Sequence, residues 1–206
     1  MENAPEEYVK KVCEMFKSYG IKSVTMDDVA RELGISKKTL YQYFKDKSEL
    51  VGIILQREFE QKAKEFSKAM DNKPNAIEEV FGYFKVQMEL LVNHKPNFMY
   101  DLKKYYPMHF EKFNKRKHSR MLDSILKNLK RGKKEGLYRK DLNEELITKM
   151  HIVRMESIMS SGLFSFEEII SPLFFSEAFK YHLFGIVSDK GREIVNKNID
   201  NIIANA

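Results

Sequence analysis

Apolar residues recur along this chain every three or four positions, and no segment alternates apolar and polar residues as a strand would. The first stripe consists of Tyr8, Val12, Met15, Phe16 and Tyr19. Periodicity, cap residues and helix breakers together predict helices over 6–19, 26–33, 37–44, 47–71, 75–93, 107–135, 143–161, 172–187 and 189–203. The pattern therefore predicts an all-α fold, with a short aromatic segment between Pro96 and Pro107.

The second and third helices are short and have strong start and stop signals. Thr25 is placed to cap the second helix, and Asp28 completes a carboxylate variant of the capping box. Gly34 ends this helix, and Ser36 caps the third. Two short helices joined by a turn of three or four residues that contains Gly describe a helix-turn-helix motif. We therefore expect the third helix to be held outward, where it can touch another molecule.

The third helix divides into a buried side and an outward side. Leu40 and Phe44 lie four residues apart and are expected to face the core. The outward side and the N-terminal end keep Lys37, Lys38, Thr39, Tyr41, Gln42 and Tyr43. In the major groove of DNA, lysine and glutamine can bind base edges, while the tyrosines and Lys47 can reach phosphates. The alternative is a purely structural helical hairpin with a solvated tyrosine face.

The stretch VTMDDVARELGISKKTLYQYFKDKSEL closely resembles the DNA-binding signature of the TetR family of bacterial transcription regulators. The resemblance runs from about Glu6 to Phe59. The matching residues are Thr25, Val29, Ala30, Leu33, Gly34, Ser36, Thr39, Leu40, Tyr41, Phe44, Lys47 and Leu50. The rest of the chain resembles the family in its length, its helical layout and the sequence GLYRKDLNEELI.

The resemblance implies an all-α homodimer of about nine or ten helices per subunit. Residues 1–50 would form a three-helix helix-turn-helix DNA-binding domain, followed by a long connecting helix over 47–71. Residues 72–206 would form a larger helical domain for ligand binding and dimerisation. The family also implies repression that is usually released by a small molecule. The two-fold symmetry of a homodimer predicts a palindromic operator in double-stranded DNA.

Carried over position by position, the family's DNA contacts fall on Lys37, Lys38, Thr39, Tyr41, Tyr43 and Lys47, with Thr25 at a phosphate. Gln42 is also a predicted DNA contact, because the helix geometry places it on the outward side. Lys37-Lys38 stands where the family often has a small residue, Tyr43 where histidine is frequent, and Asp27 where a basic residue sometimes helps. These departures bear on the operator sequence.

Two stripes are candidates for the family's dimer interface, which is formed by the last two long helices. The helix over 143–161 offers Ile147, Met150, Arg154 and Ile158, and the helix over 172–187 offers Phe175, Phe179, His182 and Ile186. The alternative is that both stripes belong to the core of a single chain, because apolar periodicity does not distinguish the two.

Methionine and aromatic side chains are frequent in the C-terminal part, and flexible methionines suit adaptable apolar pockets. The candidates for an effector pocket are Phe84, Met88, Met99, Tyr105, Phe110, Met121 and Met155. The same side chains equally fill cores. A small apolar or amphipathic effector is expected, with an anionic amphiphile slightly favoured over a cationic one by the basic segment 95–140. That segment holds 15 Lys or Arg against 4 Asp or Glu, although most such blocks are solvated faces.

Other features narrow the class of protein. A single cysteine, Cys13, excludes an intrachain disulfide and a cysteine-based zinc site, and fits a reducing compartment. The acidic N-terminus has no secretory pattern, and no apolar run is long enough for a membrane span, so a cytoplasmic protein is expected. The five histidines lack metal-ligand spacing, no cofactor motif is present, and an enzyme is not expected. The alternatives left open are a DNA-binding regulator switched by a protein partner and, as a lesser one, an all-helical enzyme.

Overall fold

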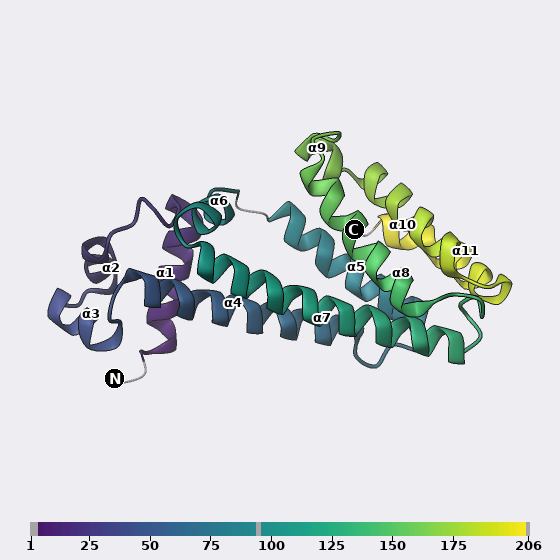
Figure 1. Cartoon of the computed structure of the whole chain (residues 1–206), viewed down its shortest axis with the longest axis horizontal. Helices are drawn as coiled ribbons and strands as arrows, with labels where there is room; N and C mark the ends of the chain where they lie inside the picture. Colours follow the sequence, from purple (N-terminus) through teal and green to yellow (C-terminus); the bar gives the residue numbers. More distant parts are fainter. Residues whose placement is uncertain (1–3, 94–95, 205–206) are drawn as a thin grey trace. The chain divides into compact units, whose positions relative to one another are not determined.

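A computed structural model describes residues 4–93 and 96–204, which form eleven helices and no named strand (Figure 1). The helices are α1 Glu6–Tyr19, α2 Met26–Leu33, α3 Lys37–Tyr43, α4 Lys47–Met70, α5 Ala76–Val92, α6 Pro96–Tyr105, α7 Pro107–Lys134, α8 Glu144–Ser160, α9 Phe166–Ile169, α10 Pro172–Ile186 and α11 Asp189–Ala204. The all-α prediction is confirmed. The aromatic segment after Pro96 is the helix α6, and the single turn α9 was not predicted.

The described residues divide into two compact units. Unit 1 contains those of 1–63 and 94–117, and unit 2 contains those of 64–93 and 118–206. The helices α4 and α7 each contribute residues to both units. This division differs from the predicted ranges 1–50 and 72–206, because α6 and the first residues of α7 pack with the N-terminal helices.

Unit 1 is built on an apolar core that holds the helix-turn-helix in place. Phe16, Leu40, Phe44 and Leu50 are fully buried, and Leu102 of α6 packs into the same cluster. Side chains from all three N-terminal helices therefore meet α4 and α6 in one core. This core fixes how α3 is presented, because Leu40 and Phe44 anchor the buried side of that helix and its end.

Unit 2 has an apolar core and a buried polar network. Its aromatic cluster includes Phe81, Phe84 and Phe179, and the Phe84 and Phe179 ring centroids are 4.0 Å apart. Tyr138 is fully buried and packs so closely against Gly132 that a Cβ on this glycine would lie 2.1 Å from the tyrosine ring. Only glycine fits at this position without displacing the ring.

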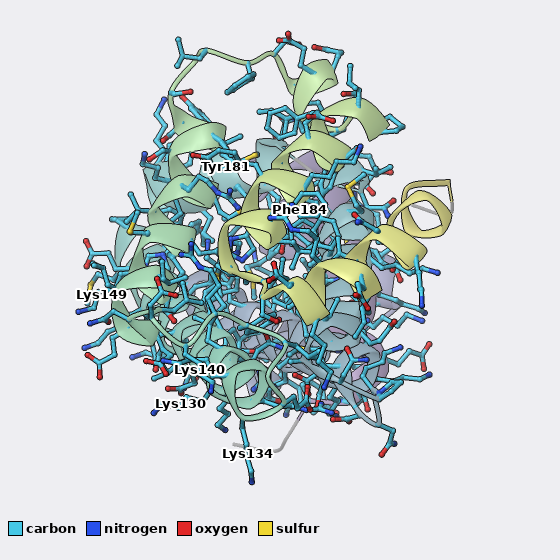
Figure 2. The ribbon with its side chains drawn as sticks, turned by 90° about the vertical axis from the view of Figure 1, so that its right-hand side faces the viewer. Lys130, Lys134, Lys140, Lys149, Tyr181 and Phe184 are labelled. Carbon is cyan, nitrogen blue, oxygen red and sulfur yellow. The ribbon has the colours of Figure 1, made fainter. Side chains whose placement is uncertain are left out.

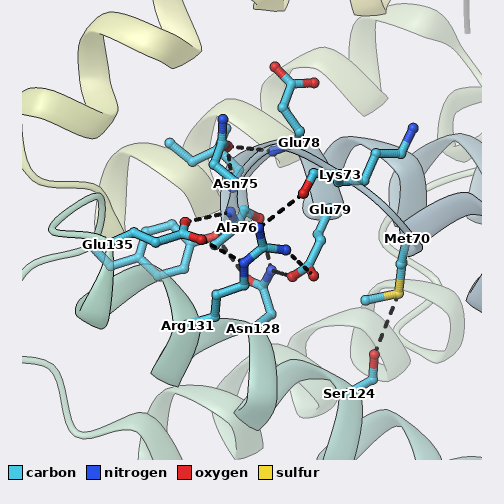
Figure 3. Close-up of polar contacts among 12 residues, drawn as sticks. Met70, Lys73, Asn75, Ala76, Glu78, Glu79, Ser124, Asn128, Arg131 and Glu135 are labelled. Atoms are coloured by element: carbon cyan, nitrogen blue, oxygen red, sulfur yellow. Dashed lines mark hydrogen bonds and ion pairs between the residues drawn. The ribbon is translucent and has the colours of Figure 1, made fainter.

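The polar network joins the start of α5 to the end of α7 (Figure 3). Asn128 Nδ2 donates to the Ala76 carbonyl at 2.8 Å, and the Tyr138 hydroxyl donates to Asn128 Oδ1 at 2.8 Å. Arg131 forms ion pairs with Glu79 and Glu135. Buried polar groups cost free energy unless they are paired, so this network requires a specific arrangement of the two helices.

Candidate nucleic-acid interface and a pocket in unit 2

The turn between α2 and α3 is held by local hydrogen bonds. Thr25 Oγ1 accepts the Asp28 N–H at 3.1 Å, and the Asp28 carboxylate accepts the Thr25 N–H at 2.9 Å, which confirms the predicted capping box. Gly34 adopts a left-handed φ of 66°. The Ile35 N–H then donates to the Ala30 carbonyl at 3.1 Å, which is the closing bond of a Schellman motif. These bonds set the direction in which the chain enters α3.

α3 begins at a second cap and has two different sides. Ser36 Oγ accepts the Thr39 N–H at 3.0 Å. Leu40, within α3, and Phe44, just after its last residue, have no exposed surface, as predicted for the core side. The side chains that remain exposed are Lys37, Lys38, Tyr41 and Gln42. The arrangement presents polar and aromatic groups to solvent on a helix whose other side is immobilised.

Two other predicted DNA contacts are partly used within the protein. Thr39 is half-buried, and its hydroxyl lies 2.8 Å from Ser36 Oγ. Tyr43 is half-buried and packs edge-on against Tyr8, with ring centroids 5.9 Å apart. Tyr43 therefore helps to position α3 on α1.

An acidic residue of α2 faces the start of α3. Lys37 Nζ forms an ion pair with Asp27 Oδ1 at 2.6 Å, and both side chains are more than half exposed. The hydrogen bond to Asp27 raises the pKa of Lys37 above its usual value. The acidic residue Asp27, where the family sometimes has a basic one, therefore affects the predicted DNA contact of Lys37. A phosphate would have to compete with this carboxylate for the Lys37 amine.

Lys47 lies at the start of α4 and is half-buried. Its Nζ donates to the Lys22 carbonyl at 3.4 Å, and burial lowers the pKa of the amine. Asp46 Oδ1 already accepts the Glu49 N–H at 2.8 Å, so one free amide of this helix end is occupied. The amine is thus held at the junction of the loop before α2 and the first turn of α4.

Sequence reasoning missed the contact between α6 and the loop before α2. The Asp101 carboxylate accepts the Lys22 N–H at 2.8 Å, and the Lys22 amine lies 5.1 Å from the centroid of the Tyr105 ring. A hydrogen bond with Lys22 lowers the pKa of Tyr105. These residues are about 80 positions apart, and no local pattern signals their contact. Tyr105, predicted for an effector pocket, instead lies on unit 1.

Unit 2 contains a pocket with mixed walls. Its lining residues are Met70, Val80, Tyr83, Phe84, Ser124, Ile125, Asn128, Leu129, His151, His182 and Ile186. The cavity volume is about 30 Å³, which is room for about two water molecules. Most walls are apolar, with a few polar groups from α5, α7, α8 and α10.

The structure separates the predicted effector residues. Phe84 lines the pocket, and Met88 is buried in the core of the same unit. Met121 and Met155 are half-buried in unit 2 without lining the pocket. Met99 and Phe110 pack against the core of unit 1, which corrects their assignment to one shared pocket with Phe84. Apolar residues that were predicted to form one pocket therefore pack in two different cores.

Two histidines and an arginine meet beside the pocket. His151 of α8 and His182 of α10 have ring centroids 4.1 Å apart and Nδ1 atoms 3.3 Å apart. Arg154 Nη2 lies 3.4 Å from His151 Nδ1. Burial, followed by the nearby Arg154 charge, lowers the pKa of His151 to about 4. Burial, His151 and Arg154 together hold the pKa of His182 well below its usual value, so both rings are neutral near neutral pH.

The predicted interface stripes are mostly core in a single chain. Phe175, Phe179 and Ile186 are buried within unit 2, which corrects their assignment to a surface. Ile147 and Ile158 are half-buried, whereas Met150 is 59% exposed. The exposed apolar residues of α8 and α10 are Leu146, Met150, Val153, Met159, Leu173 and Tyr181. Figure 2 shows Tyr181 and Phe184 on α10 in this view.

Part of the basic segment lies on the outside of unit 2, whereas Lys103 and Lys104 belong to unit 1. Lys130, Lys134 and Lys140, together with Lys149 of α8, are exposed and point outward in Figure 2. Within residues 4–93 and 96–204, no three His, Cys, Asp or Glu side chains converge as metal ligands. In the same described part of the chain, none of the helices combines the length and apolar character that crossing a bilayer requires.

Comparison with known proteins identifies the N-terminal region. Residues 11–52 match the family model described as bacterial regulatory proteins, tetR family. An HTH-type transcriptional regulator of Staphylococcus aureus (strain bovine RF122 / ET3-1) is 32% identical over 81 residues, which cover 39% of this chain and 42% of the relative. The chain thus matches less than half the length of this curated relative.

Solved structures resemble the chain over most of its length. A TetR-family transcriptional regulator from Marinobacter aquaeolei VT8 has a TM-score of 0.68 at 16% identity, covering 96% of this chain and 97% of that one. A structure from Saccharomonospora viridis, solved in complex with choline, has the same TM-score and identity and covers 88% of this chain and 96% of that one. At such identities the likeness concerns the fold alone. Residues 11–52, which contain the capped helix-turn-helix, thus match the tetR family of bacterial regulatory proteins, and the whole chain shares the all-helical fold of a solved TetR-family regulator.

Proposed function

We propose that this protein is a transcriptional regulator that binds a palindromic DNA operator as a homodimer. The observation that carries the proposal is the outward face of α3, where Lys38, Tyr41 and Gln42 are exposed on a helix anchored by fully buried side chains. A rigid support lowers the entropy cost of contacting bases, and these side chains suit base edges and phosphates.

The homodimer is supported by the exposed apolar residues of α8 and α10. Leu146, Met150 and Val153 recur every three or four positions along α8, and each is more than half exposed. Leu173 and Tyr181 of α10 are exposed to more than 70%. Large apolar side chains clustered on neighbouring helices are typical of an interaction surface. Two copies joined through this face would present two α3 helices to successive major grooves.

Regulation by a small molecule is supported by the pocket of unit 2. Helix α7 supplies the pocket residues Ser124, Ile125, Asn128 and Leu129 and continues as one chain into unit 1, where Phe110 packs on the core. A ligand that prefers the state unable to bind DNA by about 1–3 kcal/mol would weaken operator binding roughly 5- to 150-fold. Repression released by such an effector is the action that we propose.

Selection of bound sequences from random duplex DNA tests the DNA-binding part. We expect a palindrome whose half-sites lie about one helical turn, roughly 34–36 Å, apart or somewhat farther. Lys38→Ala and Gln42→Ala should relax the preference at particular bases by about 1–3 kcal/mol each. Lys149→Ala removes an exposed lysine from unit 2 and serves as the control. Selected sites that are asymmetric single half-sites would contradict the dimeric arrangement.

Lys47 tests the predicted phosphate contact separately. Loss of one phosphate contact per subunit should reduce the slope of log K against log salt by about 0.9, and so by about 1.8 for the dimer. Lys47→Ala should lower affinity equally for all sequences. An unchanged slope would show that the half-buried amine serves the loop at Lys22 and makes no phosphate contact.

A regulator switched by a protein partner is the second candidate. The observation that favours it is the small volume of the pocket, which in this conformation admits about two water molecules. A thermal-shift screen of small molecules followed by operator titration distinguishes the two. Hits that stabilise the protein and weaken operator binding support the effector, whereas hits that stabilise it without changing operator affinity support the protein partner.

A further inference from the structure

An arginine without a complete set of partners lies beside the pocket of unit 2. Among the buried side-chain nitrogens and oxygens of the described residues, Arg154 Nε alone has no hydrogen-bond partner. Burial lowers the pKa of Arg154, because the charged guanidinium loses contact with water. A buried charged group that is left unpaired is costly, so the site is poised to gain an anion.

The hydrogen-bond pattern fixes the tautomer of the first histidine. A guanidinium can only donate, so His151 Nδ1 accepts from Arg154 Nη2 and the proton of His151 is on Nε2. The contact between the two Nδ1 atoms then makes neutral His182 a donor from Nδ1, which shares the single lone pair of His151 Nδ1 with Arg154 in a bifurcated hydrogen bond. The pair is left with one donor, His151 Nε2–H, and one acceptor, His182 Nε2. Within the described part of the chain, neither Nε2 atom has a hydrogen-bond partner in the protein, and unlike Arg154 Nε both retain some accessible surface.

The groups around the histidine pair supply no negative charge. The charges that act on the pKa of His151 and His182 are Arg154 and the rings themselves. The other faces of the pocket bring Tyr83 from α5, whose pKa burial raises to about 12, and the neutral Asn128 and Ser124 from α7. Tyr181 of α10 stacks on Arg154 at 5.7 Å from its ring centroid. The polar end of the pocket is therefore positive and carries no carboxylate of its own.

We propose that this pocket binds a monocarboxylate with an apolar body. One carboxylate oxygen accepts the His151 Nε2–H, and the other pairs with His182 after its Nε2 takes up a proton, while Arg154 balances the charge from behind. The apolar body lies among Met70, Val80 and Ile125, and the flexible Met70 side chain moves to enlarge the space. The inference rests on the proposed regulation by a small molecule and names the chemical class of that molecule.

Calorimetric titration of the full chain with octanoate, and with octylamine and octanol as matched cation and neutral probes, tests the charge preference. Octanoate should bind at least roughly tenfold more tightly than either, the fold-change of one charge-assisted hydrogen bond. Butanoate and benzoate extend the test to a carboxylate with a shorter chain and to one with a planar ring. Equal binding of octylamine, or no binding of any of the three carboxylates at millimolar concentration, overturns the proposal.

Arg154→Met tests the charge behind the histidines. Octanoate affinity should fall roughly tenfold or more. Lys149→Met removes one exposed positive charge from the same helix and should leave octanoate affinity unchanged. Circular dichroism establishes that both variants fold, and sedimentation establishes their oligomeric state. If Arg154→Met dissociates a dimer and leaves octanoate affinity as it was, Arg154 serves the subunit interface and the proposal is overturned.

Proton uptake provides a readout that simple packing would not change. Both rings are neutral near pH 6, and a bound carboxylate raises the pKa of a histidine that faces it. Titration at about pH 6 in two buffers of different ionisation enthalpy should therefore show uptake of a proton with octanoate. His182→Asn, which cannot take up this proton, should abolish the uptake. Uptake that persists in the folded His182→Asn variant overturns the assigned role of His182.

The outcome for operator binding is separable from the outcome for the pocket. If octanoate binds as expected but operator affinity does not change, the carboxylate site stands and the proposed release from DNA fails. If operator affinity responds to other hits of the thermal-shift screen and no carboxylate binds, the release stands and the carboxylate proposal fails.

Discussion

The buried polar residues of the described chain, Asn128, Thr148, His151 and Ser176, all lie in unit 2, whereas the core of unit 1 buries apolar side chains and the thiol of Cys13. In unit 1 the polar side chains Lys38, Tyr41 and Gln42 are exposed on the surface of α3, where another molecule can contact them. Unit 2 keeps polar groups inside, where each requires a partner of its own. The first arrangement suits the presentation of a surface, and the second suits a site that recognises something enclosed.

The two units also differ in the burial of their long-range polar contacts. Both have local helix caps, such as Thr25 with Asp28 in unit 1 and Asn143 with Leu146 in unit 2. In unit 1 the long-range bond from the Lys22 N–H to Asp101 is exposed. In unit 2 the bond from the Asn128 amide to the Ala76 carbonyl, 52 positions away, is buried. A shift of helices in unit 2 would therefore leave buried polar groups without partners, which costs more than the loss of an exposed bond.

The largest expected effect is the loss of an apolar anchor in unit 1. Phe44→Ala should lower the free energy of unfolding by about 3–5 kcal/mol, because a fully buried ring leaves a cavity. Tyr41→Ala, on the exposed side of α3, should change it by no more than about 0.5 kcal/mol. Urea denaturation followed by circular dichroism measures both. A loss below about 1 kcal/mol for Phe44→Ala would show that α3 is not supported by this core.

Acid should act on unit 2 more strongly than on unit 1. The folded pKa of His151, about 4, lies below its unfolded value, so the unfolded state binds more protons below about pH 6.5. Stability is therefore fully present above about pH 6.5 and falls by about 3 kcal/mol as the pH drops toward 4. The lowered pKa of His182 acts in the same direction.

Hydrogen exchange across this pH range measures that difference, with the amides of unit 1 as an internal reference. Carboxylates also titrate in this window, so the comparison with His151→Gln isolates the histidine. The variant should lose part of the acid sensitivity of unit 2. An identical pH dependence in the two proteins would remove His151 as its cause.

The polar network of unit 2 should give a smaller effect. Asn128→Leu removes a donor from the Ala76 carbonyl and Glu79 and an acceptor from Tyr138 (Figure 3). A loss of about 1–3 kcal/mol is expected, because buried groups are left unpaired. Lys130→Leu, exposed on the same helix, is the matched control. If Asn128→Leu is as stable as the unchanged protein, the polar core of unit 2 is no more demanding than the apolar core of unit 1.

The smallest effect should be the same in both units. Thr25→Ala in unit 1 and Asn143→Ala in unit 2 each remove one helix cap and should each cost about 1 kcal/mol. Thermal unfolding measures both, and Thr25→Ser, which keeps the hydroxyl, should cost much less. A cost at one cap several times that at the other would place the difference between the units in the helix ends and not in the cores.

Much of the fold could be predicted from short-range patterns. The bounds Glu6–Tyr19 of α1, the capping box at Thr25, and the burial of Leu40 and Phe44 follow from residues within one or two helical turns. The turn α9 was missed even though Ser165 and Glu168 form a capping box, because one turn has too few positions to show periodicity. α6, which was predicted only as an aromatic segment, has ten residues and is longer than α2 and α3, so its length does not explain the difference.

The candidate sites were predictable where they depend on local order. The outward face of α3 was identified from a stretch of seven residues, and its family signature supported it. The pocket was not identified correctly from the sequence. The predicted residues Met99 and Phe110 pack in unit 1, whereas His151 and His182 line the pocket in unit 2. A methionine or an aromatic residue fits an apolar core and an apolar pocket equally well, so residue type alone does not assign it.

The sequence by itself determined most of the helices, their caps, the two sides of α3 and the resemblance of the N-terminal region to the TetR family, since each is encoded in neighbouring residues. Only the tertiary structure decided that Phe175, Phe179 and Ile186 are core, that α6 holds Lys22 through Asp101, and that Arg154 meets two histidines beside a pocket. The physical reason is that these contacts join residues from separate helices, whose pairing depends on how side chains pack in three dimensions and leaves no periodic trace along the chain.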